Sequence, residues 1–513
     1  MKYIFLLISL FTFNFLQAQV TGVVKDAAGE PIPGANVFWM NTTNGVTTNE
    51  DGNFSIHKPA RSHMLVVSFI GFENDTIHVD KGNQQLDIVL REGVELSEVN
   101  VVTRKLGTMK LRTSVMNEDM ISSAELTRAA CCNLGESFVT NPSVDVSYSD
   151  AATGAKQIKL LGLSGTYVQM MTENIPNFRG AAAPYGLGYV PGPWMQSIQV
   201  SKGSSSVKNG YESITGQINV EFKKPQLPEA DWVSANLFAS STNRYEANAD
   251  ATVKLSKRWS TSLLAHYENE TKSHDSNDDG FVDIPRVEQY NVWNRWAYMG
   301  DHYVFQAGIK ALHETRNSGQ IAHGNTPSHD LYEIGIKTNR YEAFTKNAYI
   351  FDKEKNTNLA LILQGTLHNQ DANYGRKLYD VDQSNFYASL LFETELSKQH
   401  SLSAGLSFNY DGYDQNYRLT NQAEEGLTKK FVKESVPGAY VQYTFNLNDQ
   451  LMLMGGIRGD YSSEYGFFVT PRAHVKYNPN EYLHFRVSAG KGYRTNHVLA
   501  ENNYLLASSR KMK

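Results

Sequence analysis

Apolar and polar residues alternate along strand-length stretches of the chain from about residue 231 onward. The segment 259–268 shows the pattern: Trp259, Thr261, Leu263, Ala265 and Tyr267 fall on one face, and Ser260, Ser262, His266 and Glu268 on the other. The same period of two recurs over 303–311 and 483–489. Because successive side chains of a β-strand point to opposite faces, the pattern predicts a long series of half-buried strands.

Short links separate some of these predicted strands, and longer links separate the others. The short links lie at 256–258, 300–301, 397–399, 446–449 and 478–481, and the long ones near 271–289, 315–332, 370–384 and 413–434. A soluble sandwich also alternates, but its polar face looks outward and its loops show no such asymmetry. Short turns at one end and long loops at the other are typical of a transmembrane antiparallel β-barrel, with apolar residues facing lipid and polar residues facing the lumen.

The number of predicted strands is small for a large outer-membrane barrel. We count about 13, whereas the larger outer-membrane barrels have about 22. An open edge is unfavourable inside a bilayer, because each unpaired backbone group there costs several kcal/mol. The chain also reaches Lys513 without a final strand that ends in an aromatic residue. We therefore expect residues 230–513 to be the N-terminal part of a truncated barrel.

A different pattern occupies residues 19–92, where short apolar runs are separated by turn residues. Asp51-Gly52 is a turn pair of this kind, and the connection at 31–34 contains two prolines. The spacing predicts a small β-sandwich. Its expected core consists of Val37, Phe54, Ile56, Val66, Phe69, Ile88 and Leu90.

Residues 117–132 carry signs of a helix. Ser122-Ser123 is a candidate N-cap, and Leu126, Ala129 and Ala130 share one helical face.

Residues 1–18 have the composition of a secretory signal peptide. Lys2 supplies a positive start, the run 3–15 is apolar, and Ala18 is a small residue before a cut at Gln19. A membrane anchor is the alternative, but a span needs about 20 apolar residues. We expect this segment to be cleaved and the mature chain to be exported.

The stretch from Trp194 to Phe222, WMQSIQVSKGSSSVKNGYESITGQINVEF, predicts two strands joined by a Gly/Ser-rich loop. It closely resembles the end of the plug domain of TonB-dependent outer-membrane transporters, which reads roughly "IExIEVxKGxxSxxYGxxAxGGxINIxTKxP". The matching positions here are Lys202-Gly203, Gly210, Gly216, Ile218-Asn219-Val220 and Lys224-Pro225. Three earlier landmarks of the plug occur in order: 141–144, 158–163 and 167–176. Leu161 stands where the family has arginine, and Glu173-Asn174 stand where it has Asp-Gly.

The resemblance implies an all-β dominated architecture in which a small sandwich is followed by an α+β plug and then by the barrel. The segment 19–92 resembles the carboxypeptidase regulatory-like domain that precedes such transporters in Bacteroidetes, and implies no peptidase activity. The expected plug spans 107–225, and 93–106 links it to the sandwich. The family implies a cell outer-membrane location in contact with lipid, and a periplasmic N-terminal domain.

The linker contains a candidate segment for binding the energy-transducing protein TonB. It resembles the TonB box, an extended segment that pairs with its partner by strand addition, and reads roughly "LxEVVV" in the family. A plain strand is the alternative. The candidate residues are Leu96, Glu98, Val99, Asn100, Val101 and Val102. Asn100 departs from the pattern, and Val102 follows directly after it.

Composition narrows the function further. The chain has 513 residues with 11% aromatic residues, yet its mean hydropathy is −0.42, as expected when lipid-facing and lumen-facing residues alternate. The net charge is −5, and the basic residues form no patch of the kind that nucleic acid requires. No nucleophile–base set, pair of acid/base carboxylates or phosphate loop is evident, so we do not expect an enzyme.

The loop at 275–283 resembles the first nine positions of a calcium-binding loop. The candidate ligands are Asp275, Asn277, Asp279 and Asp283, with a glycine at the sixth position. Arg286 stands where the bidentate glutamate belongs, and a simple acidic turn is the alternative. Calcium is thus the one cofactor that the sequence suggests, and none is required.

Cys131 and Cys132 are adjacent in the plug. In an oxidising compartment they are candidates for a vicinal disulfide, for buried thiols or for soft metal ligands. Several methionines of the plug would suit Cu(I) but are more often core filler: Met116, Met120, Met170, Met171 and Met195.

The leading hypothesis is TonB-dependent active import of a scarce nutrient across the outer membrane. Cargo would bind the external loops and the plug apex, and TonB would then remodel the plug. A siderophore, another metal chelate, cobalamin or an oligosaccharide would each suit this architecture, and the residues do not select among them. The alternative is a surface receptor or adhesin that binds a ligand without transport.

Overall fold

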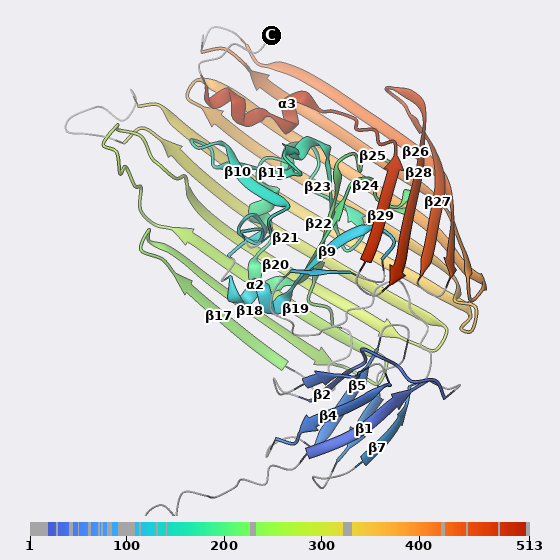
Figure 1. The fold of residues 1–513 in the computed structure, drawn as a ribbon. Helices are drawn as coiled ribbons and strands as arrows, with labels where there is room; N and C mark the ends of the chain where they lie inside the picture. Colours follow the sequence, from blue (N-terminus) through green and yellow to red (C-terminus); the bar gives the residue numbers. More distant parts are fainter. Residues whose placement is uncertain are drawn as a thin grey trace, which may run out of the picture. The chain divides into compact units, whose positions relative to one another are not determined.

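The computed structural model divides the chain into two compact units, Met1–Arg104 and Lys105–Lys513 (Figure 1). The structure describes residues 19–26, 29–40, 45–49, 51–59, 63–69, 72, 75–79, 85–90, 108–111, 114–129, 132–139, 141–225, 232–321, 331–421, 426–447, 450–480 and 483–508. Within these ranges no helix is long and apolar enough to span a bilayer. The expected signal peptide and TonB-binding segment lie outside the described residues.

The first unit is a β-sandwich with its own core. One sheet consists of β4 (Asn53–His57), β1 (Gln19–Lys25) and β7 (Gln85–Val89), and the other of β3 (Gly45–Thr47), β2 (Asn36–Trp39), β5 (Met64–Ser68) and β6 (Asp75–His78). Five of the seven predicted core residues belong to the buried cluster: Val37, Phe54, Ile56, Ile88 and Leu90. Phe69 packs against that cluster while half-buried, and Val66 is buried outside it.

The second unit begins with the plug, which we define as residues 108–225. Its six-stranded sheet has the order β14-β13-β16-β15-β9-β8, and a separate three-stranded sheet has the order β10-β11-β12. The strands are β8 (Thr108–Lys110), β9 (Asn117–Ser122), β10 (Val144–Asp150), β11 (Ala155–Leu160), β12 (Leu163–Ser164), β13 (Val168–Thr172), β14 (Ile175–Pro176), β15 (Met195–Lys202) and β16 (Gly216–Phe222). Helical turns connect them: α2 (Ser123–Arg128) and the 3₁₀ helices η1 (Leu134–Glu136), η2 (Gly165–Tyr167), η3 (Gly180–Ala182), η4 (Gly186–Tyr189), η5 (Gly192–Trp194) and η6 (Val207–Asn209).

The two strands predicted within 194–222 are β15 and β16, which pair antiparallel. Every residue of β16 is buried, because the strand lies between β13 and β15 and both of its faces are covered.

The predicted helix at 117–132 is only partly correct. Residues 117–122 form strand β9, which pairs with β15 so that Ile121 lies opposite Ile198. Helix α2 covers only 123–128, and the Ser122 side chain makes no capping hydrogen bond. Strand pairing and burial outweigh the weak local helix preference of this segment.

Thirteen antiparallel strands follow in sequence order from β17 to β29, as the alternation predicts. They are β17 (Trp232–Ala239), β18 (Arg244–Lys254), β19 (Trp259–Glu270), β20 (Arg286–Met299), β21 (Tyr303–Gly319), β22 (Glu333–Asp352), β23 (Thr357–Tyr374), β24 (Lys377–Ser397), β25 (His400–Arg418), β26 (Thr428–Leu447), β27 (Leu451–Ser462), β28 (Gly466–Asn480) and β29 (Leu483–Gly490). In the described part of the chain, β17 and β29 are the two edges of this sheet. Helices α3 (Val498–Glu501) and η8 (Asn503–Ala507) come after β29.

The large sheet exposes its apolar face and buries its polar one. Ile309 of β21 is 70% exposed, whereas the adjacent Lys310 is 4% exposed. The buried polar side chains point toward the plug, whose elements lie within the curve of the sheet in Figure 1. This inversion is expected of strands with one face toward lipid and one toward a lumen.

One predicted loop is wrong. The segment 370–384 is not a long loop, because β23 and β24 run through it and turn at Gly375-Arg376. Gly375 has a φ of +60°, a conformation that glycine adopts without strain, and this allows the tight turn. Tyr374 and Tyr379 are fully buried on the inner face, so the alternation continues to the tip of the hairpin.

Candidate functional site

The hairpin between β13 and β14 fixes the plug to the sheet wall. Its turn residues Glu173 and Asn174 both have positive φ, as in the two-residue turns that match the twist of a hairpin. Both carboxylate oxygens of Glu173 accept hydrogen bonds from Arg295 Nη2 of β20, at 2.6 and 2.8 Å. Lys346 of β22 donates to the Glu173 backbone carbonyl at 2.7 Å. Two wall strands therefore hold one turn of the plug.

The charge state of Glu173 follows from these neighbours. Burial alone would raise its pKa, but Arg295, Lys346 and Lys224 outweigh burial and lower the pKa to about 2. Glu173 is therefore ionised throughout the physiological range.

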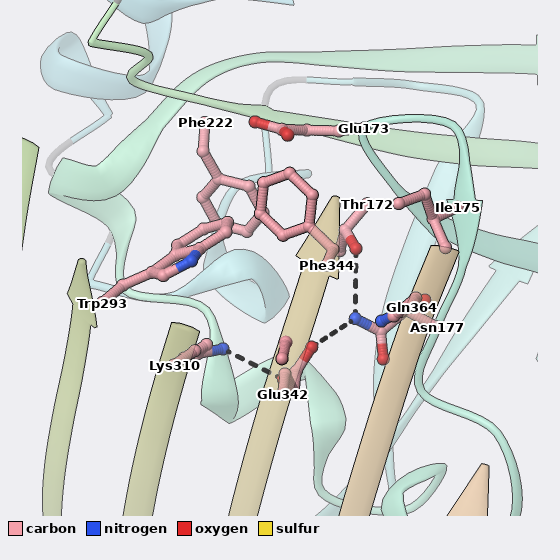
Figure 2. Close-up of a pocket in the computed structure, with 11 residues that line it drawn as sticks. Thr172, Glu173, Ile175, Asn177, Phe222, Trp293, Lys310, Glu342, Phe344 and Gln364 are labelled. Carbon is pink, nitrogen blue, oxygen red and sulfur yellow. Dashed lines mark hydrogen bonds and ion pairs between the residues drawn. The ribbon is translucent and has the colours of Figure 1, made fainter. Parts of the chain in front are cut away.

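Polar and aromatic side chains of the plug and the wall line a small pocket next to Glu173 (Figure 2). Asn177 Nδ2 donates to Thr172 Oγ1 and to Glu342 Oε2, each at 3.0 Å, and so joins the plug to β22. Phe222 of β16 meets the Trp293 ring of β20 edge-on at 4.6 Å between centroids. The space left here is about 20 Å³, which is room for about one water molecule. Plug and wall are therefore closely packed at this contact.

A second set of ionic contacts joins the plug to strand β25. Arg179 forms ion pairs with Glu212 of the plug at 3.0 Å and with Asp411 of β25 at 3.1 Å. Burial opposes its charge, yet the two carboxylates raise the pKa of Arg179 further above its usual value. The next residue, Gly180, has a φ of +59° and lies against Tyr413, so a side chain at this position would collide with the wall.

Arg472 of β28 organises the Gly/Ser-rich loop that the sequence singled out. Its Nη1 donates to the carbonyls of Ser205 and Ser206 at 3.2 and 3.0 Å, and its Nε to the carbonyl of Lys491 at 3.2 Å. The plug loop and the segment after β29 therefore share one anchor on the wall.

Two cavities flank the apex of the plug, and both are lined by Lys156, Pro184 and Leu187. One has a volume of about 240 Å³ and is bounded by plug residues and by residues 494–504. The other has a volume of about 250 Å³ and lies between the plug and strands β17 to β21. Burial lowers the pKa of Lys156, whose ammonium lies 5.3 Å from the centroid of the Tyr148 ring. These cavities are the candidate cargo sites.

The segment 491–508 partly covers the first cavity. Arg494 and Glu501 form an ion pair at 3.0 Å within the segment and line the cavity. Asn503 Oδ1 accepts hydrogen bonds from Tyr185 of the plug at 3.3 Å and from Tyr374 of β23 at 2.9 Å. The segment thus connects the end of β29 to the plug apex and to distant strands.

The predicted site residues have different outcomes. Cys131 and the TonB-binding segment lie outside the described residues. Cys132 is buried and lines the second cavity, and burial together with Glu246 raises the pKa of its thiol, which does not favour a thiolate ligand. Metal binding by the two cysteines therefore stays a prediction.

The loop at 275–283 is described throughout. Asp275 accepts hydrogen bonds from the backbone of Asp279 at 3.1 Å and of Gly280 at 2.9 Å, and Asp283 from the backbone of Ser276 at 2.7 Å. The hydrogen bond from Ser276 lowers the pKa of Asp283. In the described ranges, no group of three or more His, Cys, Asp or Glu side chains is arranged to hold a metal ion. The calcium site stays a prediction.

The sequence analysis missed Arg295, Arg179 and Arg472. For Arg295 and Arg472 the available signal was a charged residue at a lumen-facing position of an alternating strand, as in the segment 290–299, whereas Arg179 lies in a plug segment without such alternation. This signal predicts that a charged residue is buried, but it does not predict which residue pairs with it.

The sheet is strongly curved and has an apolar outer face, and buried charges hold the plug within its curve. These features define a class of proteins, the plugged outer-membrane receptors. Family models agree: the TonB dependent receptor-like β-barrel matches residues 200–506, the TonB-dependent receptor plug domain 110–217, and the CarboxypepD_reg-like domain 20–102. The chain belongs to the TonB-dependent receptor family, whose members are outer-membrane proteins.

The chain is similar to the TonB-dependent receptor SusC of Bacteroides thetaiotaomicron, with 28% identity over 45% of this chain and 24% of that protein. It is similar to the TonB-dependent receptor P39 of Formosa agariphila, with 39% identity over 19% of this chain and 10% of that protein. In fold it resembles the siderophore receptor PirA of Acinetobacter baumannii, with a TM-score of 0.61, 15% identity, and coverage of 76% of this chain and 63% of that one. The chain therefore spans a quarter or less of these two curated relatives and under two thirds of that solved structure.

The Glu173–Arg295 contact gives a stability prediction. Glu173→Gln keeps the shape of the side chain and leaves the buried Arg295 without its counter-ion, so it should lower the free energy of unfolding by about 3–5 kcal/mol. The matched control is Asp301→Asn, which breaks the Arg258–Asp301 pair, whose side chains are 54% and 72% exposed. This control should cost under about 1 kcal/mol. Denaturant titration of the full chain in detergent measures both.

The same pair predicts a pH effect. Because the pKa of Glu173 is lower in the folded chain, its contribution is complete above its unfolded value of about 4.3 and declines as the pH falls toward about 2. Glu173→Gln should lack this component. Equal acid sensitivity of the two proteins would contradict the assignment.

The calcium hypothesis is tested by calorimetry on the full chain. Asp275→Ala with Asp279→Ala removes two charged oxygen ligands of a hard cation. The wild type should bind with a Kd on the order of 10⁻⁴–10⁻³ M, as extracellular modules do, and the double variant should not bind. Asp352→Ala with Glu354→Ala, in another turn, is the control. No heat from the wild type at millimolar calcium would leave only the acidic turn.

Proposed function

We propose that the protein is a TonB-dependent importer that carries a scarce nutrient across the outer membrane. The observation that supports this most is the close packing at Glu173 and Trp293, where plug and wall leave a space of only about 20 Å³. Cargo does not fit through this contact, so in this proposal the plug has to move. Movement requires an energy source, and the outer membrane has no ion gradient of its own to supply it.

Cargo binds, in this proposal, in the two cavities at the plug apex. Each is of about 240–250 Å³, just below the usual range of ligand-pocket volumes. Both are lined by side chains of both charges: the first by Lys156, Arg179 and Glu212, and the second by Lys156, Glu136 and Arg244. Such a lining suits a polar, charged cargo such as a metal chelate, a siderophore or cobalamin.

TonB engages the segment 96–102 and pulls on the plug. An extended segment with valines at 99, 101 and 102 suits pairing by strand addition, in which the backbone supplies affinity and alternate side chains supply specificity. The pull has to separate Glu173 from Arg295, and Arg179 from Asp411.

Proline substitution tests this coupling. Val99→Pro or Val101→Pro removes a backbone donor and bends a segment that must pair as a strand. In bacteria that produce the receptor, cellular iron, copper and cobalt are measured by mass spectrometry under limitation of each metal. One of these metals should be more abundant in cells with the wild-type receptor than in cells without a receptor. With either proline variant, the cellular content of that metal should fall to the content of receptor-free cells. Surface binding of the corresponding labelled chelate should persist.

Thr103→Pro, in the same linker but outside the segment, is the matched control and should transport normally. Normal uptake with both valine variants would place TonB binding elsewhere. Binding at the surface without TonB-dependent uptake by the wild type would favour the alternative function, a surface receptor or adhesin.

A further inference from the structure

The second cavity, between the plug and strands β17 to β21, contains a carboxylate without a counter-ion. Glu270, the last residue of β19, lines this cavity and is only 8% exposed. Among the residues that the structure describes, none forms an ion pair or a hydrogen bond with its carboxylate. A buried charge of this kind is costly unless it acquires a partner. Its place in the wall of a cavity points to a ligand as that partner.

Arg244 is the cation nearest to Glu270 in register, because the two residues lie opposite each other on β18 and β19. Its guanidinium is nevertheless fully used by other carboxylates. Nη1 lies 2.9 Å from Glu136, Nη2 lies 2.7 Å from Glu246, and Nε lies 2.9 Å from Glu268. One positive charge is thus shared by three carboxylates and cannot also neutralise a fourth.

The other cations near this cavity are also committed elsewhere. Arg316 forms an ion pair with Glu314 at 3.0 Å. The Nε2 atom of His274 lies 2.7 Å from a backbone carbonyl oxygen. The ammonium of Lys156 lies over the ring of Tyr148, 5.3 Å from its centroid. Negative charge is therefore in excess around the cavity, and Glu270 is the carboxylate that remains unpaired.

The cavity suits an organic cation better than a metal ion. It has a volume of about 250 Å³ and is lined by the rings of Tyr148 and Phe238, and aromatic faces attract organic cations. Tyr148 is 54% exposed, so solvent reaches the cavity. In the described ranges, no group of three or more His, Cys, Asp or Glu side chains is arranged to hold a metal ion. Arg244 already lies among the carboxylates and would repel one.

We propose that this cavity binds an organic cation, an alkylammonium or guanidinium group of the cargo, with Glu270 as its counter-ion. The proposal rests on the proposed function, because it names the chemical class that one of the two candidate cargo cavities takes. A bound cation gives the buried carboxylate the partner that it lacks. A neutral or anionic cargo of the same size would leave Glu270 unpaired.

The test is calorimetry with the full chain in detergent and agmatine as the probe, which carries a guanidinium and an ammonium group. The wild type should bind agmatine, and it should bind neither pentanol nor pentanoate, which are neutral and anionic molecules of similar length. Glu270→Gln should weaken the affinity for agmatine by about tenfold or more, as removal of one partner of a buried charge pair does. Glu270→Asp keeps the charge and should bind more tightly than Glu270→Gln.

Glu333→Gln is the matched control, because Glu333 is an exposed residue of β22 outside the cavity, and its affinity should equal that of the wild type. Denaturant titration checks the folding of each variant. Glu270→Gln should unfold at the same denaturant concentration as the wild type or a higher one, because it removes a charge that has no counter-ion.

The proposal is overturned if the wild type does not bind agmatine at millimolar concentration, if Glu270→Gln binds it equally well, or if pentanoate binds as tightly. Displacement of agmatine by calcium or zinc would identify a metal site and contradict the proposal. A lower unfolding midpoint of Glu270→Gln would show that the carboxylate is already paired, which also overturns it. The measurement requires neither TonB nor energised cells, so its failure is distinct from a failure of TonB-dependent uptake.

Discussion

A sheet that turns its apolar side chains outward must find partners for the polar side chains on its other face. In this chain that face carries buried arginine, lysine and carboxylate groups, and an unpaired buried charge costs several kcal/mol even after the protein relaxes around it. The plug supplies the partners: Glu173 for Arg295, Arg179 for Asp411, and backbone carbonyls of its Gly/Ser-rich loop for Arg472. Plug and sheet therefore depend on each other for their charge balance.

This kind of contact suits the plug movement that we propose. A buried ion pair fixes orientation strongly, but it adds little net stability because its formation requires both charges to lose water. Apolar contacts also cross the interface, among them Phe222 on Trp293 and Tyr211 on Phe468, but they do not fix the position of a charged group. When the plug is displaced, water entering the lumen can solvate the separated charges and so lower the cost of opening. The same charges hold the closed plug in one position.

The sequence predicted the parts that depend on local periodicity. Alternation gave the large sheet with its strand number, and turn residues gave the sandwich and most of its core. The helix predicted at 117–132 was only partly correct, because residues 117–122 pair with β15 as a strand. The local sequence does not indicate a pairing partner that lies so far along the chain. The prediction of a long loop at 370–384 was wrong, because the polar residues near the tip of a hairpin have the same composition as those of a loop.

The site was less predictable for the same reason. The motif comparison aligned Glu173-Asn174 with the Asp-Gly of the family, but the partner Arg295 lies 122 residues away and only the folded sheet brings the two together. The two cavities likewise combine side chains from the plug, from several strands and from residues 494–504. The spacing of residues along the sequence does not predict contacts between residues that lie so far apart. The TonB-binding segment lies outside the described residues and stays a prediction.

The central claim is that the plug leaves the polar wall when the receptor works. Ser206 reports on this directly, because it is buried and its hydroxyl donates to Gln442 Oε1 of β26 at 2.6 Å. In Ser206→Cys, labelling by a membrane-impermeant maleimide should be slow in de-energised cells and faster in energised cells that contain TonB. The parent protein without this cysteine corrects for Cys131 and Cys132. Equal labelling rates in energised and de-energised cells would contradict the account.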